Sequence, residues 1–243
     1  MTYVPPAVRL LADRLDGLGW VSDLLVAGSL ATGDYVPGVS DLDLVALTGG
    51  PVGAARQEML AGLHRELDRE AAHGLDMGCA YVDAGRLADL GALHPTWTHG
   101  SLVQRSLSGV TRAELVRHGF AVLGRAPAAV LPEMTDDDVR RAARAELCGP
   151  WAQTIRRPLW WLSPVIADLG LTSMARGRHA LRTGQLLTKT EAIERAHAPA
   201  WLKDQLRARR RGEQVTSPRG RTALIAWRDT RRTVASARRV APP

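Results

Sequence analysis

The chain contains two apolar runs, Leu24-Leu25-Val26-Ala27-Gly28-Ser29 and Ser40-Asp41-Leu42-Asp43-Leu44-Val45, with a short polar insert between them. The first run ends in Gly-Ser, and the second begins with two alternating carboxylates. Apolar runs of this length favour β-strands, and the glycines and proline of the insert favour a loop. The sequence therefore predicts a strand over about residues 23–28, a turn with a short helix, and a second strand over about residues 41–47.

The two carboxylates of the second run, Asp41 and Asp43, are predicted to share one face of their strand. Side chains alternate along a strand, so Leu42 and Leu44 would point to the opposite face and into a core. Neighbouring carboxylates repel each other unless a cation lies between them, and oxygen ligands suit Mg²⁺, which takes its other ligands from water and phosphates. Asp41 and Asp43 are therefore candidate metal ligands, with a solvated strand end or turn as the alternative.

The Gly-Ser pair that ends the first run has the chemistry of a phosphate-binding turn. Gly28 permits a close approach of the backbone, and the Ser29 hydroxyl and the N–H groups at the helix start can bind phosphate oxygens. Each feature alone is common and indicates only a turn. Together, and in this order before an Asp-x-Asp strand, they indicate nucleotidyl transfer.

Length and composition indicate a globular protein. A chain of 243 residues can form one large or two small domains, and its 45% hydrophobic and 23% charged residues are ordinary values. No apolar run approaches the roughly 20 residues that span a membrane, and residues 1–6 lack a signal-peptide pattern. We therefore expect a cytoplasmic protein without a membrane partner. Cys79 and Cys148 are expected to be free thiols, which excludes a thiolate metal site.

The formal charge of +7 is concentrated in the last third of the chain, which is rich in arginine. Such a charge suits either a nucleic-acid surface or an arginine-rich and alanine-rich composition. Arginine runs such as residues 209–211 are usually solvated helix ends, and these arginines lack the interleaved aromatic residues that stack on bases. We therefore expect no nucleic-acid partner, and a basic RNA- or DNA-binding protein stays as an alternative.

The pattern of elements changes at about residue 127. Before it, helices are predicted over residues 6–19, 51–73 and 111–119, further strands over 75–83 and 120–124, and an irregular segment over 84–109 with a loop at 93–100. After it, every predicted element is helical, over residues 139–149, 151–162, 164–183, 188–211 and 217–239. The predicted fold class is α+β, with a mixed sheet flanked by helices in an N-terminal domain, residues 1–126, and an all-helical bundle in a C-terminal domain, residues 127–243.

Asp76 and Trp97 are further candidates for the site. Asp76 stands near the start of the predicted third strand, and pairing of that strand with the Asp41 strand would bring both carboxylates to one sheet edge. A plain strand-end aspartate is the alternative. Trp97 lies in a predicted loop, where an aromatic side chain can stack on a ligand, and core packing is the alternative.

Several motifs occur in the order typical of one family. They are Arg117–Gly124 with the following Pro127, Leu171-Thr172, Arg176, Thr183-Gly184 and Lys189. With the Gly-Ser and Asp-x-Asp signature of polymerase-β-like nucleotidyltransferases, the chain from about residue 20 to 230 resembles the aminoglycoside adenylyltransferases that modify streptomycin and spectinomycin. The resemblance implies a monomer that transfers AMP from ATP to a hydroxyl of such an antibiotic, with Mg²⁺ as cofactor and pyrophosphate as the second product.

The resemblance implies a role for each motif residue. On the nucleotide side, these are the triphosphate contacts Gly28 and Ser29, the Mg²⁺ ligands Asp41 and Asp43, the catalytic carboxylate Asp76, and the second-domain phosphate contacts Arg176 and Lys189. On the acceptor side, Trp97 falls at an aromatic residue that packs on the antibiotic. Asp168 is the nearest candidate for an acidic antibiotic contact, and a salt-bridged helix residue is the alternative for it.

The chain departs from the family pattern at several points. Asp76 is one methylene shorter than the usual glutamate, Lys189 is followed by Thr190 rather than aspartate, and the insert before Asp41 is slightly long. A polycationic antibiotic also requires a locally acidic cleft on a protein whose formal charge is +7. Two alternatives therefore stay open: a nucleotidyltransferase with another acceptor, and a nucleotide-binding regulatory module with weakened catalysis.

Overall fold

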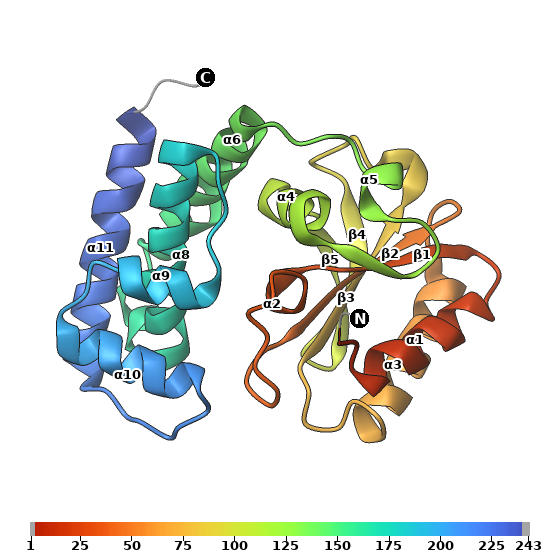
Figure 1. Cartoon of the computed structure of the whole chain (residues 1–243), viewed down its shortest axis with the longest axis horizontal. Coiled ribbons are helices and arrows are strands. Elements are labelled where there is room, and N and C mark those ends of the chain that lie inside the picture. The colour runs from red at the N-terminus through yellow and green to blue at the C-terminus, as the bar shows by residue number, and fades with distance from the viewer. Residues whose placement is uncertain (1–2, 240–243) are drawn as a thin grey trace. The chain divides into compact units, whose positions relative to one another are not determined.

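The structure is a computed structural model that describes residues 3–239. The chain forms two compact units that divide between Glu133 and Met134 (Figure 1), whereas the sequence predicts a division between residues 126 and 127. The first unit is built on a mixed β-sheet flanked by helices, and the described part of the second unit is helical. The predicted α+β fold class is therefore confirmed.

A six-stranded sheet with the order β5-β4-β3-β2-β1-β6 forms the first unit. Its strands are β1 (Val21–Val26), β2 (Leu42–Thr48), β3 (Met77–Asp83), β4 (Leu93–Thr98), β5 (Ser101–Ser106) and β6 (Phe120–Leu123). β2 and β3 run parallel, and the other neighbouring pairs are antiparallel. Because a parallel pair needs a long crossover, a helix connects β2 to β3. The four strands predicted from the sequence correspond to β1, β2, β3 and β6.

Alternating apolar side chains give this sheet two buried faces. The helices of the unit are α1 (Pro6–Asp16), α2 (Gly28–Ala31), α3 (Ala54–Arg69), α4 (Gly109–His118), α5 (Pro127–Val130) and the 3₁₀ turn η1 (Ala84–Arg86). Leu24 and Leu44 belong to the face that packs against α1 and α3. Leu25 and Val45 belong to the opposite face, which packs against α4. Both faces are therefore apolar over their centre, and polar groups of these strands collect at the strand ends.

The β4–β5 hairpin occupies residues that the sequence predicts to be irregular. The prediction of an irregular segment over 84–109 with a loop at 93–100 is wrong. Proline is disfavoured inside a sheet, so Pro95 argues against a strand when only the sequence is considered. β4 nevertheless pairs with β5 along its whole length. The two strands are joined by the turn His99–Gly100, where both φ angles are positive, at 47° and 73°.

The second unit is a set of helices with short connections. They are α6 (Asp136–Glu146), the π-helical turn η2 (Leu147–Trp151), α7 (Ala152–Thr154), the 3₁₀ turn η3 (Pro158–Leu162), α8 (Pro164–Thr183), α9 (Lys189–Arg195), α10 (Ala200–Arg210) and α11 (Arg219–Arg239). α8 has the predicted bounds and ends at Gly184, which adopts a positive φ of 73°. None of the helices within residues 3–239 has the length and apolarity that crossing a lipid bilayer requires.

Two of the helices predicted in this unit are each interrupted in the structure, so these predictions are wrong. The predicted helix over 151–162 is broken into α7 and η3. Pro158 causes this break, because proline removes a helical hydrogen bond and restricts the residue before it. The predicted helix over 188–211 is two helices, with Pro199 as the residue that precedes the second one.

An ion pair between a buried aspartate and an exposed arginine joins the sheet to the segment that follows β6. The side chain of Asp23 in β1 is fully buried, and its Oδ2 lies 2.7 Å from Nη2 of Arg125. The Arg125 backbone N–H also donates to Asp23 Oδ1 at 2.6 Å. Burial alone would raise the pKa of Asp23, but the hydrogen bonds from Arg125 and Ser22 outweigh it and lower the pKa below its ordinary value.

This ion pair predicts how stability depends on pH. Because the pKa of Asp23 is lower in the folded than in the unfolded chain, its stabilisation is present above pH ~4 and is lost as the pH falls through the folded value. Asp23→Asn should lower the free energy of unfolding at pH 7 by about 2 kcal/mol and should flatten its decline below pH ~4. Urea unfolding at several pH values measures both effects. Asp13→Asn, at an exposed position of α1, is the control and should change neither.

Candidate active site

Gly28 and Asp43 lie in direct contact where β1 and β2 meet the α2 turn. The Ala27 N–H donates to the Asp43 carbonyl at 2.8 Å, which extends the β1–β2 pairing by one residue. Gly28 has a positive φ of 61°, and a Cβ atom built on it would lie 2.0 Å from Asp43 Oδ2. Glycine is therefore required at this position both by conformation and by the close approach of the carboxylate.

Ser29 is the second residue of the short helix α2. It is 6% exposed, and its Oγ is buried without a hydrogen-bond partner among residues 3–239. Buried hydroxyls are normally hydrogen-bonded, so an orphaned one suits a polar ligand such as a phosphate oxygen. The hydroxyl of Thr32 caps the same turn by donating to the Gly28 and Ser29 carbonyls at 3.2 and 3.3 Å.

Asp41 and Asp43 flank the buried Leu42 at the beginning of β2. Both aspartates are exposed, whereas Leu42 is 0% exposed, as the alternation of side chains along a strand requires. Among the described residues, no three carboxylate, histidine or cysteine side chains gather closely enough to form a metal site. Two carboxylates nevertheless fit Mg²⁺, because this ion usually binds one or two protein carboxylates together with water and phosphates.

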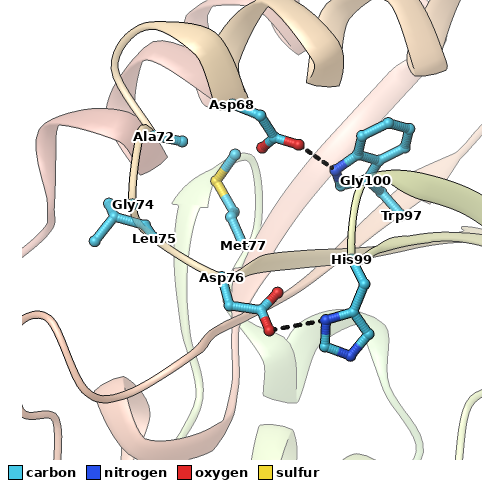
Figure 2. Close-up of a pocket in the computed structure, with 9 residues that line it drawn as sticks. All are labelled: Asp68, Ala72, Gly74, Leu75, Asp76, Met77, Trp97, His99 and Gly100. Atoms are coloured by element: carbon cyan, nitrogen blue, oxygen red, sulfur yellow. Dashed lines mark hydrogen bonds and ion pairs between the residues drawn. The ribbon is translucent and has the colours of Figure 1, made fainter.

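Asp76 occupies the same sheet edge, one residue before β3. The Leu42 N–H donates to the Asp76 carbonyl at 2.8 Å, and Leu42 pairs with Met77 in the parallel register. Neighbouring strands lie about 5 Å apart, so Asp41 and Asp76 start adjacent strands. The Asp76 carboxylate, however, bonds to His99, with Oδ2 3.1 Å from Nδ1 (Figure 2).

Two pockets adjoin these carboxylates. The first has a volume of about 380 Å³ and contains Asp68 and Asp76, with Leu75, Met77, Trp97 and His99 among its walls (Figure 2). Burial raises the pKa of Asp68, and although a hydrogen bond from Trp97 lowers it, the charge of Asp76 raises it further. The second has a volume of about 240 Å³, and its polar lining residues are Asp43, Thr96, Thr98, Arg105, Ser106, Ser108 and Thr111.

Trp97 lies on the face of the sheet opposite to Asp43. It pairs with Cys79 across β3 and β4, whereas Asp43 pairs with Gly78, the next position along β3. The indole stacks on the imidazole of His64 in α3, with 5.0 Å between the ring centroids. Its Nε1–H donates to Oδ2 of Asp68 at 3.2 Å. Trp97 is 2% exposed. The indole is therefore packed within the core, which is the alternative that the sequence analysis gives for Trp97. We do not propose Trp97 as an acceptor contact.

Cys79 lines the smaller pocket but supplies no thiolate to this site. Cys79 and Cys148 are both free thiols, as predicted. Burial raises the pKa of Cys79 to about 12, so this thiol is protonated at neutral pH. Protonated and buried thiols neither bind metal ions nor act as nucleophiles.

Arg176 and Lys189 lie near each other in the second unit. The Nε atom of Arg176 in α8 donates to the Leu187 carbonyl at 3.0 Å, two residues before Lys189. Lys189 is the first residue of α9, whose N-terminus is closed by a capping box between Thr188 and Glu191. The fold of this unit thus brings Arg176 beside the segment that leads into Lys189, and the resemblance implies both as phosphate contacts.

Asp168 has its carboxylate occupied within the second unit. Arg209 donates from Nε to Oδ2 at 2.6 Å and from Nη2 to Oδ1 at 2.9 Å. Burial raises the pKa of Asp168, although the Arg209 hydrogen bonds oppose this. Such a bidentate pair ties α8 to the end of α10. Asp168 is therefore a salt-bridged helix residue, which is the alternative that the sequence analysis gives for it. We do not propose Asp168 as an acceptor contact.

The architecture of this chain is similar to that of a solved structure. No family model matches the chain, and no curated protein matches it. Among solved structures, it is similar to the crystal structure of spectinomycin adenyltransferase AAD(9) from Enterococcus faecialis, with a TM-score of 0.70 and 15% sequence identity over 93% of this chain and 98% of that chain. The chain therefore shares the fold of AAD(9). The AAD(9) crystal structure contains ATP and spectinomycin.

Some residues near the candidate site were not found from the sequence. Asp68 lies in the last turn of α3, where the amphipathic pattern gives no sign of a pocket. Thr96 and Thr98 alternate as one face of a strand does, and this signal becomes readable only when β4 is recognised as a strand. His99 could be found from the sequence only after β4 and β5 are recognised as strands, because it then lies in the two-residue turn between them.

The Gly28–Asp43 contact predicts a non-additive mutational effect. Gly33 is a matched control, because its φ of 72° is also positive and a Cβ atom there would meet nothing within 4 Å. Gly33→Ala should lower the free energy of unfolding by about 1 kcal/mol through backbone strain alone, and Gly28→Ala by about 2–3 kcal/mol because it also displaces Asp43. In the double variant with Asp43→Ala, the excess cost of Gly28→Ala should largely disappear in urea unfolding. Equal costs for both glycines would contradict the contact.

Proposed function

We propose that this protein is a nucleotidyltransferase that uses Mg²⁺ and ATP to transfer AMP to a hydroxyl of an aminoglycoside-type antibiotic, with release of pyrophosphate. The observation that carries the proposal is the contact between Gly28 and the carboxylate of Asp43. In this contact, the turn that we propose to bind phosphate lies beside the carboxylate that we propose as a metal ligand, which supports the proposal. The similarity of the fold to an adenylyltransferase supports the same chemistry.

Residues of the first unit would hold the nucleotide. Ser29 has a buried hydroxyl without a hydrogen-bond partner among residues 3–239, which suits a triphosphate oxygen, and Gly28 beside it is proposed to contact the triphosphate through its backbone. Asp41 and Asp43 would bind Mg²⁺, which when bound would neutralise negative charge on the phosphates. Arg176 and Lys189, in the second unit, are proposed phosphate contacts that act through charge-assisted hydrogen bonds.

Asp76 is proposed as the general base. Its carboxylate would take the proton from the acceptor hydroxyl, whose oxygen would then form a bond to the α-phosphorus while the bond from that phosphorus to pyrophosphate breaks. Asp76 is 39% exposed at the side chain and borders the larger pocket, so an acceptor can reach it.

The local charge of the larger pocket supports an antibiotic acceptor. Aminoglycoside-type antibiotics carry ammonium groups, and the formal charge of +7 on this protein would repel them. Asp68 and Asp76 make this pocket acidic, although His99 adjoins it. The AAD(9) structure contains spectinomycin, which makes this antibiotic the first acceptor to test.

Pyrophosphate release is the assay that decides the proposed function. Purified protein is incubated with ATP and Mg²⁺ and with spectinomycin, streptomycin or unrelated hydroxyl compounds. We expect release with one of the antibiotics and none without Mg²⁺. Release only with another hydroxyl compound would keep the enzyme class and replace the acceptor. Binding of Mg·ATP without release for any acceptor would favour a regulatory nucleotide-binding module and would overturn the proposal.

The carboxylates at the start of β2 should be essential for turnover. Asp41→Asn and Asp43→Asn remove negative oxygen ligands, and each should lower kcat/KM for ATP by at least about 100-fold, since several kcal/mol of charge stabilisation are lost. Circular dichroism spectra should stay unchanged because both positions are exposed. Asp13→Asn is the control and should keep full activity. An active Asp43→Asn variant would contradict the assigned role.

The two cations of the second unit should act on nucleotide binding. Arg176→Ala and Lys189→Ala should each raise KM for ATP about 10-fold, because one charge-assisted hydrogen bond contributes about 1.5–3 kcal/mol. Steady-state kinetics with varied ATP and saturating acceptor measure this change. Arg182→Ala removes an exposed cation from the same helix, α8, and should leave KM unchanged. An equal rise in all three variants would point to a general charge effect instead.

A further inference from the structure

His99 contacts the proposed base from a neighbouring hairpin. Its Nδ1 atom lies 3.1 Å from Oδ2 of Asp76, and Figure 2 shows the imidazole turned toward that carboxylate. A carboxylate has only acceptors to offer, so Nδ1 carries the proton in this contact. The Nδ1–H group therefore donates to Oδ2 and leaves the other oxygen, Oδ1, without this bond.

The backbone at His99 is unusual for this residue type. Its φ of 47° makes it the one non-glycine residue with a positive φ within residues 3–239. Two-residue turns with positive φ at both positions normally contain Asn-Gly, because asparagine and glycine tolerate this conformation best. Here histidine precedes Gly100, and histidine has no advantage over asparagine for the turn itself. The turn alone does not explain the imidazole.

Stability does not explain the pair either. The side chain of His99 is 74% exposed and that of Asp76 is 39% exposed. Ion pairs and hydrogen bonds with this much exposure are screened by water and salt, and they contribute little to the free energy of unfolding. What the contact does is restrict where the Asp76 carboxylate lies.

Two features make a positioned carboxylate useful at this place. Asp76 is short, so its reach toward an acceptor hydroxyl depends closely on its rotamer. Asp68, on the wall of the same pocket, repels the Asp76 carboxylate because both carry negative charge. A hydrogen bond from His99 opposes this repulsion and holds one oxygen, which leaves the second oxygen for chemistry.

We propose that His99 is a positioning residue that holds Asp76 as the general base. Oδ2 accepts the His99 Nδ1–H bond, and Oδ1 takes the proton of the acceptor hydroxyl. The oxygen of that hydroxyl bonds to the α-phosphorus as the bond to pyrophosphate breaks, and Asp76 later releases the proton to water. The inference rests on the proposed function for its catalytic part.

Three variants separate the imidazole from the turn. His99→Gly keeps the backbone conformation and removes the donor, and His99→Asn keeps the backbone conformation and offers a side-chain N–H. His73→Asn is the control at an exposed position that does not itself line the pocket. We expect His99→Gly to lower kcat about 10-fold, because an orienting hydrogen bond is lost. We expect kcat of His99→Asn to lie between those of His99→Gly and the wild-type protein. KM for ATP and the Mg²⁺ concentration for half-maximal rate should stay unchanged in every variant.

Each result of this comparison has a definite meaning. Full kcat in His99→Gly, in an active wild-type background, would overturn the inference and leave the proposed function intact. A shift of the Mg²⁺ dependence in His99→Gly would also overturn it, because that result would make Asp76 a metal ligand. A wild-type protein that is inactive with every acceptor would overturn the proposed function, and the catalytic part of this inference with it.

The contact itself is tested without turnover. Nitrogen-15 spectra report which ring nitrogen of a neutral histidine carries the proton, and His99→Asn identifies the His99 signal by its loss. We expect the Nδ1–H form for His99 in the wild-type protein and a shift toward the Nε2–H form in Asp76→Ala. The Nε2–H form in the wild-type protein would show that the bond to Asp76 is not made, and would overturn the inference at its base.

Discussion

The parallel pairing of β2 with β3 is the constraint on which the candidate site depends. The hydrogen bond from Leu42 N–H to the Asp76 carbonyl begins this pairing, so the residues before the two strands, Asp41 and Asp76, come to the same sheet edge. A slip of one residue in β2 would turn its carboxylates toward the α1 and α3 face and Leu42 toward the opposite one. Burial of Leu42 in the core therefore decides where the carboxylates point.

The Gly28 turn and the Asp43 carboxylate are fastened to one rigid scaffold. A backbone hydrogen bond links Ala27 to Asp43, and the lack of a side chain on Gly28 lets the carboxylate pack against the turn. Sites built on paired strands are held more accurately than sites built on loops. Asp76 differs, because its side chain is directed by His99 from a hairpin turn. The position of the proposed metal ligand Asp43 is thus fixed by strand pairing, and the carboxylate of the proposed base is oriented by a polar contact with another segment.

The parts that were predicted correctly from the sequence are those with a strong local pattern. The apolar runs at β1, β2, β3 and β6 and the long α8 helix are of this kind. The β4–β5 hairpin was not found, because Pro95 interrupts the alternation and the stabilising partner of β4 lies in β5. Breaks at Pro158 and Pro199 were likewise placed inside helices, since a proline can begin one helix as well as end another.

By itself, the sequence determined the strand, turn and strand around Gly28, the shared face of Asp41 and Asp43, and the helical character of the second half. Strand alternation and turn chemistry act over a few neighbouring residues, so they can be read along the chain. Only the tertiary structure decided that Trp97 stacks on the far face of the sheet, that Arg209 occupies Asp168, and that His99 holds Asp76. These outcomes depend on partners distant in the chain, and folding alone brings them together.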